Sequence, residues 1–307
     1  MIHNVPTAED LETISLRLYF NAWASVASIV AEFNDVIGLP EEWDTYAEAA
    51  QNDLQGIYTL ALQSQEIGIK SLIARVSPYL LLKRYDARPM VPATNDFDFS
   101  DFPTIEAGEL VRAHNMFCSV ALSQGFADDF ERLRRGRNKI AHLGVFHEKL
   151  DPHDLIDLLF KHYAALYPAR RWLPDRLTFV SSDRWAGFDS GSDWSPRGAV
   201  LTELWDIQAD LTPEQLEIIF GRPSDEQRYV CPSCAQVLEK HTWGSEPYGA
   251  DTPTAFLDSA EKLNCALCSE TFALRKHRCN DEDCAGRHLA GAPEHDERCI
   301  ACGHTQD

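Results

Sequence analysis

Eight of the nine cysteines in this 307-residue chain are crowded into its C-terminal quarter as four closely spaced pairs. In chain order these pairs are Cys231 and Cys234, Cys265 and Cys268, Cys279 and Cys284, and Cys299 and Cys302. The first two pairs are separated by thirty residues and the last two by fourteen. Two cysteines this close can turn both sulfur atoms onto one metal ion, and two such turns complete a tetrahedral site. The spacing therefore predicts two structural zinc ions, each bound by four thiolates.

The spacing leaves the pairing of the cysteines open. An interleaved arrangement is also compatible with it, and a histidine can replace a thiolate. The candidates are His241, His277, His288, His295 and His304. Gly303 directly after the last pair is the small residue that such turns often need. Because four thiolates leave no coordination position for water, we expect these sites to fold a domain rather than to catalyse a reaction.

The remaining composition predicts a soluble protein of the cytoplasm. Hydrophobic residues make up 44% of the chain, which is enough for a core, and no segment approaches the roughly 20 apolar residues of a membrane span. Met1–Glu12 lacks the basic start and apolar run of a secretion signal. Short-spaced cysteine pairs with Cys118 left alone indicate metal binding in a reducing compartment rather than disulfides.

The first half of the chain is predicted to form a bundle of about five helices, because its apolar residues recur at intervals of three and four. The expected helices span residues 11–37, 46–85, 105–124, 126–150 and 153–167. We expect a kink at Ser77-Pro78 in the second and an interruption near Gly136 in the fourth. The proline-rich stretch at residues 86–103 is predicted to be a long loop.

The fold class is therefore mainly α, in three parts. Residues 1–167 form the bundle, residues 168–228 a connector packed on it, and residues 229–307 two small β-rich zinc-ribbon-like sites. Within the connector, residues 177–181 resemble a short strand and residues 190–196 a turn-rich loop. A short helix follows, with Thr212 as its N-cap, Pro213 at its first position and Gly221 at its end.

The net charge of −20 repels nucleic acid on average, so binding to RNA requires a local basic patch. Such a patch lies between Glu131 and His142. Its cations, with no acid among them, are Arg132, Arg134, Arg135, Arg137 and Lys139. A solvated helix face that offsets the acidic surroundings is the alternative interpretation.

Arg137-Asn138-Lys139-Ile140-Ala141-His142 resembles the Arg-polar-x-His motif of the HEPN superfamily, whose members are helical bundles and frequently metal-independent ribonucleases. The resemblance covers roughly residues 11–167: two long helices, a variable loop, a further helix and then the motif. It implies an endoribonuclease with Arg137, His142 and Asn138 in its site, a homodimer that pools two motifs, and a setting in prokaryotic defence such as abortive infection. The Tyr that follows the His by two residues in toxin-type members is Gly144 here.

These residue types suit RNA cleavage. The arginine fork binds a scissile phosphate, and a histidine exchanges protons with the ribose 2′-hydroxyl or the leaving 5′-oxygen, which leaves a 2′,3′-cyclic phosphate. On one helix Asn138 and His142 share a face, whereas Arg137 and His142 diverge by about 140°. We therefore expect Gly136 to start a new helix near Arg137 and to add a helix N-terminus to the anion site.

Five further residues are assigned supporting roles. Arg132, Arg134, Arg135 and Lys139 are expected to position phosphates, and Glu66 is expected to orient Arg137 or His142. Surface charge is the alternative for each.

Two functions follow. In the first, the chain is a ribonuclease whose zinc ribbons recognise RNA or a regulatory protein. In the second, the bundle is inactive and the chain is a scaffold that binds protein or nucleic acid.

Overall fold

The computed structural model describes residues 2–83, 97–143, 149–182, 195–241, 252–292 and 295–306. Its contacts divide the chain into an N-terminal unit, Met1–Pro168, and a C-terminal unit, Ala169–Asp307. The first boundary that the sequence suggests, after residue 167, lies within one residue of this division. Residues 169–228 fall in the same unit as the cysteines, and their expected packing on the bundle stays a prediction.

The N-terminal unit is a bundle of α-helices with two very short strands. Its α-helices are α1 (Ala8–Val36), α2 (Trp43–Ala49), α3 (Gln51–Val76), α4 (Ala107–Phe117), α5 (Gln124–Leu143) and α6 (Pro152–Leu166). Short 3-10 turns are η1 (Pro40–Glu42), η2 (Pro78–Leu81) and η3 (Phe99–Asp101), and the parallel strands are β1 (Ile2–His3) and β2 (Phe97–Asp98). The prediction that this part of the chain forms a helical bundle is confirmed.

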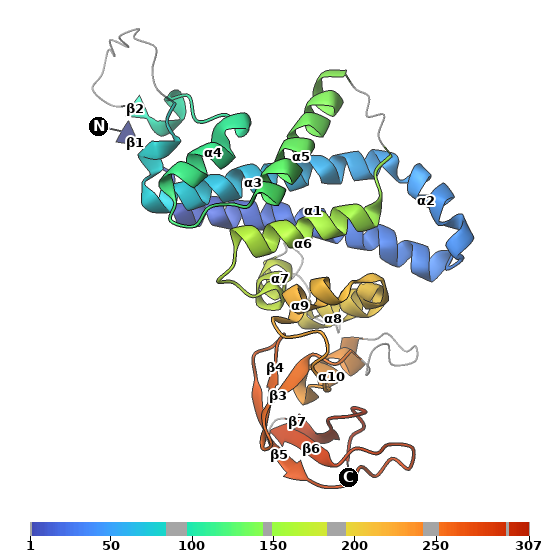
Figure 1. Cartoon of the computed structure of the whole chain (residues 1–307). Coiled ribbons are helices and arrows are strands. Elements are labelled where there is room, and N and C mark those ends of the chain that lie inside the picture. The colour runs from blue at the N-terminus through green and yellow to red at the C-terminus, as the bar shows by residue number, and fades with distance from the viewer. Residues whose placement is uncertain are drawn as a thin grey trace. The chain divides into compact units, whose positions relative to one another are not determined.

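Helices α1 and α3 lie side by side along their lengths and form the centre of the bundle (Figure 1). Thr7 caps α1, because its hydroxyl accepts a hydrogen bond from the amide of Asp10 at 3.0 Å. The core between α1 and α6 is aromatic: the rings of Trp23 and Phe160 lie 5.0 Å apart, and those of Tyr19 and Tyr163 lie 5.3 Å apart. The sequence predicts no membrane span, yet α1, alone among the described helices, is long and apolar enough for one by length and composition; 56% of its apolar window is buried in the bundle, as in the core helix of a globular fold.

The second and third expected helices end earlier than their periodicity predicts. The stretch at residues 46–85 is divided into α2, α3 and η2, and Ser77-Pro78 ends α3 rather than kinking it. Ser77 is extended, at φ −168° and ψ 130°, because a residue before proline avoids the helical conformation. The third, expected to reach residue 124, ends at Phe117. Part of the stretch beyond Leu143, where the fourth was expected to continue, lies outside the described residues. Most of the expected loop at residues 86–103 lies outside the described residues.

The C-terminal unit contains four helices followed by one antiparallel sheet. The helices are α7 (Trp172–Ser181), α8 (Pro196–Ile207), α9 (Pro213–Phe220) and α10 (Pro232–His241), with the 3-10 turn η4 (Gln208–Asp210). The strands are β3 (Ala255–Ser259), β4 (Lys262–Cys265), β5 (Thr271–Lys276), β6 (His288–Ala292) and β7 (His295–Cys299). They pair in sequence order, β3-β4-β5-β6-β7.

Only some of the elements predicted for the connector, residues 168–228, are observed. The strand predicted at residues 177–181 is wrong, because these residues complete α7, whose Arg176 is buried and paired with Glu203 of α8. That tertiary pairing outweighs the β propensity of Thr, Phe and Val. Helix α9 has the expected cap at Thr212 and ends at Gly221, which adopts a left-handed φ of 66°. The loop expected at residues 190–196 lies almost wholly outside the described residues.

Candidate metal centres and candidate active site

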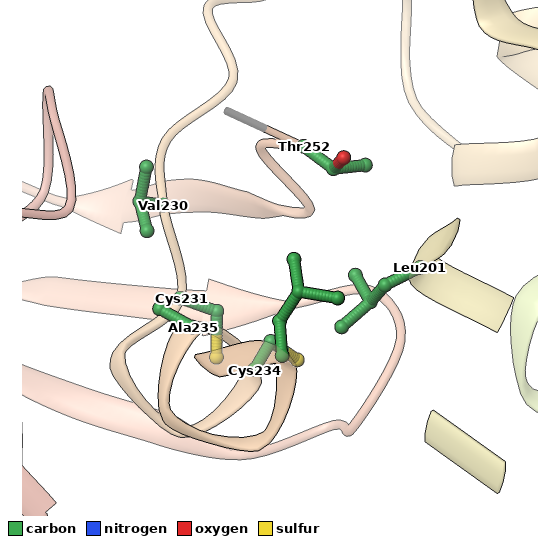
Figure 2. A pocket seen from close by; sticks show the side chains of 7 residues that line it. Leu201, Val230, Cys231, Cys234, Ala235 and Thr252 are labelled. Atoms are coloured by element: carbon green, nitrogen blue, oxygen red, sulfur yellow. The ribbon is translucent and has the colours of Figure 1, made fainter. Parts of the chain in front are cut away.

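The first cysteine group joins the start of α10 to the turn between β4 and β5. Cys231 precedes α10 and Cys234 lies in its first turn, where Pro232 occupies the first helical position (Figure 2). Cys265 ends β4, and Cys268 follows in a turn closed by a hydrogen bond from the Ser269 amide to the Cys265 carbonyl, 3.0 Å long. All four sulfur atoms lie within 4.8 Å of one another.

The second group is built on β5, β6 and β7. Cys279 follows β5, Cys284 lies in the connection to β6, and Cys299 ends β7 before the turn that contains Cys302. Gly303 has a φ of 76°, and its amide donates to the Cys299 carbonyl at 2.8 Å, so the expected role of a small residue here is confirmed. These four sulfur atoms also lie within 4.8 Å of one another.

The structure therefore combines the first pair with the second and the third with the fourth. The interleaved arrangement is wrong, and neither group includes a histidine among the residues whose side chains the structure describes. The two cysteine groups are attached to one sheet, so they are two sites of one small fold rather than two separate ribbons.

The sulfur–sulfur distances fit a tetrahedral metal ion. In the first group, the sulfur atoms of Cys231 and Cys268 lie 3.7 Å apart, as do those of Cys234 and Cys265. In the second group, the corresponding distances are 3.7 Å between Cys279 and Cys302 and 3.8 Å between Cys284 and Cys299. Metal–sulfur bonds of about 2.3 Å, as in zinc sites, give a tetrahedron with edges of about 3.8 Å. A disulfide would bring two sulfur atoms to about 2.05 Å. Both groups are thus compatible with structural metal ions.

The ionisation of the cysteines in the first group is compatible with a bound cation. Hydrogen bonding from Cys231, Cys234 and Cys268 lowers the pKa of Cys265 well below its usual range. Hydrogen bonds with Cys231, Cys265 and Cys268, together with burial, raise the pKa of Cys234. A divalent cation bound by these four sulfur atoms would take the place of the protons on them.

Neighbouring groups shape both sites. The guanidinium of Arg197 in α8 donates to Ser233 Oγ at 2.6 Å and carries positive charge near the first group. Beside the second group, the amide of Gly286 donates to Cys284 Sγ at 3.3 Å. A Cβ on Gly286 would lie 2.4 Å from Cys299 Sγ, so only glycine fits there. Neither residue was a candidate in the sequence, because both lie outside the cysteine pairs.

The basic segment forms one uninterrupted helix, α5. The break expected at Gly136 is therefore wrong, and no helix N-terminus adds to an anion site at Arg137. Gly136 instead allows close packing on α3: a Cβ there would lie 2.5 Å from Tyr58 Oη. That hydroxyl also donates to the Arg132 carbonyl at 2.9 Å.

Along α5 the three candidate catalytic side chains have different surroundings. Arg137 Nη2 lies 3.3 Å from Glu66 Oε1 of α3, and both side chains are partly buried. Asn138 is half-buried, and the exposed His142 lies one turn further on the same face. His142 has no hydrogen bond or ion pair with any residue that the structure describes. Because α5 is continuous, Arg137 and His142 diverge by about 140°.

The expected phosphate-positioning arginines are already paired with carboxylates. Arg132 contacts Asp129 at 2.9 Å, and both Arg134 and Arg135 contact Glu131 at 2.7 Å. Hydrogen bonds from Arg134 and Arg135 lower the pKa of Glu131 to about 2. Lys139 is exposed. The acidic partners lie N-terminal to the basic run, where helical spacing of three and four residues brings them onto its face.

The comparisons give no relative for this chain: no family model matches it, and neither a curated protein nor a solved structure matches it.

Proposed function

We propose that the chain is a metal-independent endoribonuclease of HEPN type in which Arg137 and His142 are the catalytic residues and Asn138 assists them. The observation that carries this proposal is the placement of the motif on α5: Glu66 holds Arg137 from the facing helix, and His142 is exposed one turn beyond Asn138. A held guanidinium and a free imidazole are the two groups that phosphodiester cleavage by a 2′-hydroxyl requires.

In the proposed reaction, Arg137 binds the non-bridging phosphate oxygens and stabilises their growing negative charge. His142 accepts the proton of the 2′-hydroxyl, whose oxygen then forms a bond to phosphorus. The bond from phosphorus to the 5′-oxygen breaks, and a protonated His142 side chain donates a proton to that oxygen. The products are a 2′,3′-cyclic phosphate and a 5′-hydroxyl.

A homodimer follows from the direction of the side chains. Since Arg137 and His142 leave α5 about 140° apart, one chain presents them poorly to the same phosphate. Two copies that face each other along α5 pool two arginines and two histidines around one RNA strand.

The activity is tested with full-length protein purified without chelator and assayed for RNA cleavage during brief exposure to EDTA. Arg137→Ala and His142→Ala are expected to lower cleavage by at least about a hundredfold, as removal of a general base or of an electrostatic stabiliser does. Arg112→Ala, an exposed arginine of α4, is the matched control and should cleave like wild type. Unchanged cleavage in both motif variants would remove this mechanism.

We further propose that the two cysteine groups bind zinc, because four thiolates in a tetrahedral arrangement are the ligands that structural zinc prefers. A reducing compartment, the cytoplasm, keeps those thiolates available. Metal analysis of the purified protein should give two zinc ions per chain, and well under two would count against this assignment.

The cysteine-rich region is proposed to recognise RNA or a regulatory protein. The exposed cations Lys276, Arg278 and Arg287 lie at the end of β5 and just before β6, and no described carboxylate forms an ion pair with them. Nearby acids, Asp281, Glu282 and Asp283, oppose general binding to nucleic acid. These features support a narrow RNA contact or a protein contact.

A second candidate function is an inactive scaffold that binds protein or nucleic acid. It is favoured by the ion pairs of α5, because Arg132, Arg134 and Arg135 must each leave a carboxylate before contacting phosphate. The two functions differ in cells. A nuclease used in prokaryotic anti-phage defence should arrest growth and degrade RNA when expressed, and His142→Ala should abolish both effects. A scaffold should not depend on His142 in this way.

A further inference from the structure

The two cysteine groups belong to one continuous fold in the C-terminal unit. Strands β3 to β7 form a single sheet, in which β4 ends with Cys265 of the first group and β7 ends with Cys299 of the second. Helix α10, which begins at the first group, contacts both β6 and β7. The element that positions one metal centre therefore packs on the strands that position the other.

A buried arginine joins α10 to the second group. Arg298 is only 4% exposed and directly precedes Cys299. Its Nη1 and Nη2 donate to the two carboxylate oxygens of Glu239 in α10 at 2.6 and 2.7 Å, which is a bidentate pair. Its Nη1 also donates to the carbonyl of Gly303 at 3.2 Å, in the turn that contains Cys302.

A backbone contact makes a second connection beside the ligands themselves. The amide of Val230, the residue before Cys231, donates to the carbonyl of Ile300, the residue after Cys299, at 2.8 Å. Val230 and Ile300 are both buried. A movement of the Cys299–Cys302 turn therefore removes a hydrogen bond that positions the first ligand of the other group.

From these contacts we propose that the two sites bind their metal ions as a coupled pair, with Arg298 as the positioning residue that couples them. The inference rests on the proposal that both groups bind zinc. A metal ion at the second group fixes the turn that supplies the carbonyls of Ile300 and Gly303, and so fixes α10 and Cys231. Because coupling between sites is reciprocal, a metal ion at the first group stabilises the second equally.

The test follows the removal of zinc from the full-length, zinc-loaded protein by increasing chelator, with native mass spectrometry counting the metal ions per chain. Two independent sites leave at least about half of the molecules with one zinc when half of the zinc is gone. Coupled sites instead give mainly molecules with two or none. One-zinc molecules at or above half in the wild type would overturn the coupling, whereas wild type isolated without zinc would overturn the zinc proposal instead.

Two variants test the role of Arg298. Arg298→Met and the milder Glu239→Gln are both expected to raise the one-zinc population well above that of wild type. Arg275→Met is the matched control, because Arg275 forms a similar bidentate pair that joins β5 to Glu297 of β7 rather than to α10. It should keep the wild-type distribution. If both Glu239→Gln and folded Arg298→Met kept the wild-type distribution of zinc ions per chain, the role of the ion pair between Arg298 and Glu239 would be overturned.

A ligand variant measures the coupling directly. Cys302→Ser weakens the second site and is expected to make the first zinc ion about tenfold easier to extract, within the range usual for coupled sites. In a Glu239→Gln background the same substitution should have little further effect on the first site. An undiminished tenfold effect in that background would contradict coupling through the bridge.

Discussion

At the scale of single residues, His162 shows how strongly burial controls ionisation in this bundle. The imidazole is 2% exposed, packs 4.7 Å from the ring of Phe126 and contacts the amide of Gln65. Burial, with smaller contributions from Arg132 and Lys161, lowers its pKa from 6.5 to about 3. The folded protein therefore keeps His162 neutral at pH values where an unfolded chain is protonated.

This difference predicts a pH-dependent loss of stability. Because the folded-state pKa is depressed, the unfolded state binds the extra proton below pH 6.5, so stability falls as the pH decreases from there toward 3. Between pH 7 and pH 5 the loss should be about 2 kcal/mol. His162→Gln should lack this component, which urea unfolding of both proteins at the two pH values measures as a difference. An equal pH dependence in the two proteins would refute the assignment.

At the scale of secondary-structure elements, α5 is positioned by its close approach to α3. Gly136 faces Tyr58, which leaves no room for a β-carbon, and Glu66 on α3 contacts Arg137 one residue further along α5. The glycine that the sequence suggests as a helix break is therefore a packing residue. It sets the separation of the two helices that position the candidate site (Figure 1).

Gly136→Ala is accordingly expected to destabilise the protein by about 1–3 kcal/mol, because its methyl group would overlap the Tyr58 ring. Gly125→Ala, in the first turn of the same helix, is the matched control. Its methyl group would meet only Ser123 Oγ at 3.9 Å, so stability should change by less than about 1 kcal/mol. Urea denaturation of both variants measures the difference, and equal stabilities would contradict the packing role.

At the scale of the whole molecule, the proposed dimer predicts complementation between inactive chains. A homodimer of the Arg137→Ala variant lacks both catalytic arginines, and a homodimer of the His142→Ala variant lacks both catalytic histidines. A mixed dimer of the two variants keeps one Arg137 and one His142. Mixing and exchanging the two variants should therefore restore cleavage to at least about tenfold above either variant alone. Sedimentation at assay concentration checks the dimer, and the absence of restored cleavage from a verified mixed dimer would refute pooled sites.

The sequence by itself determined the features that depend on local spacing. Four cysteine pairs predict metal centres because a short turn brings two sulfur atoms together in any fold. The helical periodicity and the caps at Thr212 and Gly221 likewise require only neighbouring residues.

Only the tertiary structure decided what depends on residues distant in sequence. The order in which the cysteine pairs combine follows from the strand order of one sheet, and the helical state of residues 177–181 follows from packing of α7 on α8. The bridge from Arg298 to Glu239 crosses from β7 to α10, and the close approach of Gly136 to Tyr58 crosses from α5 to α3. Burial and helix packing created these contacts, and no local pattern in the chain records them.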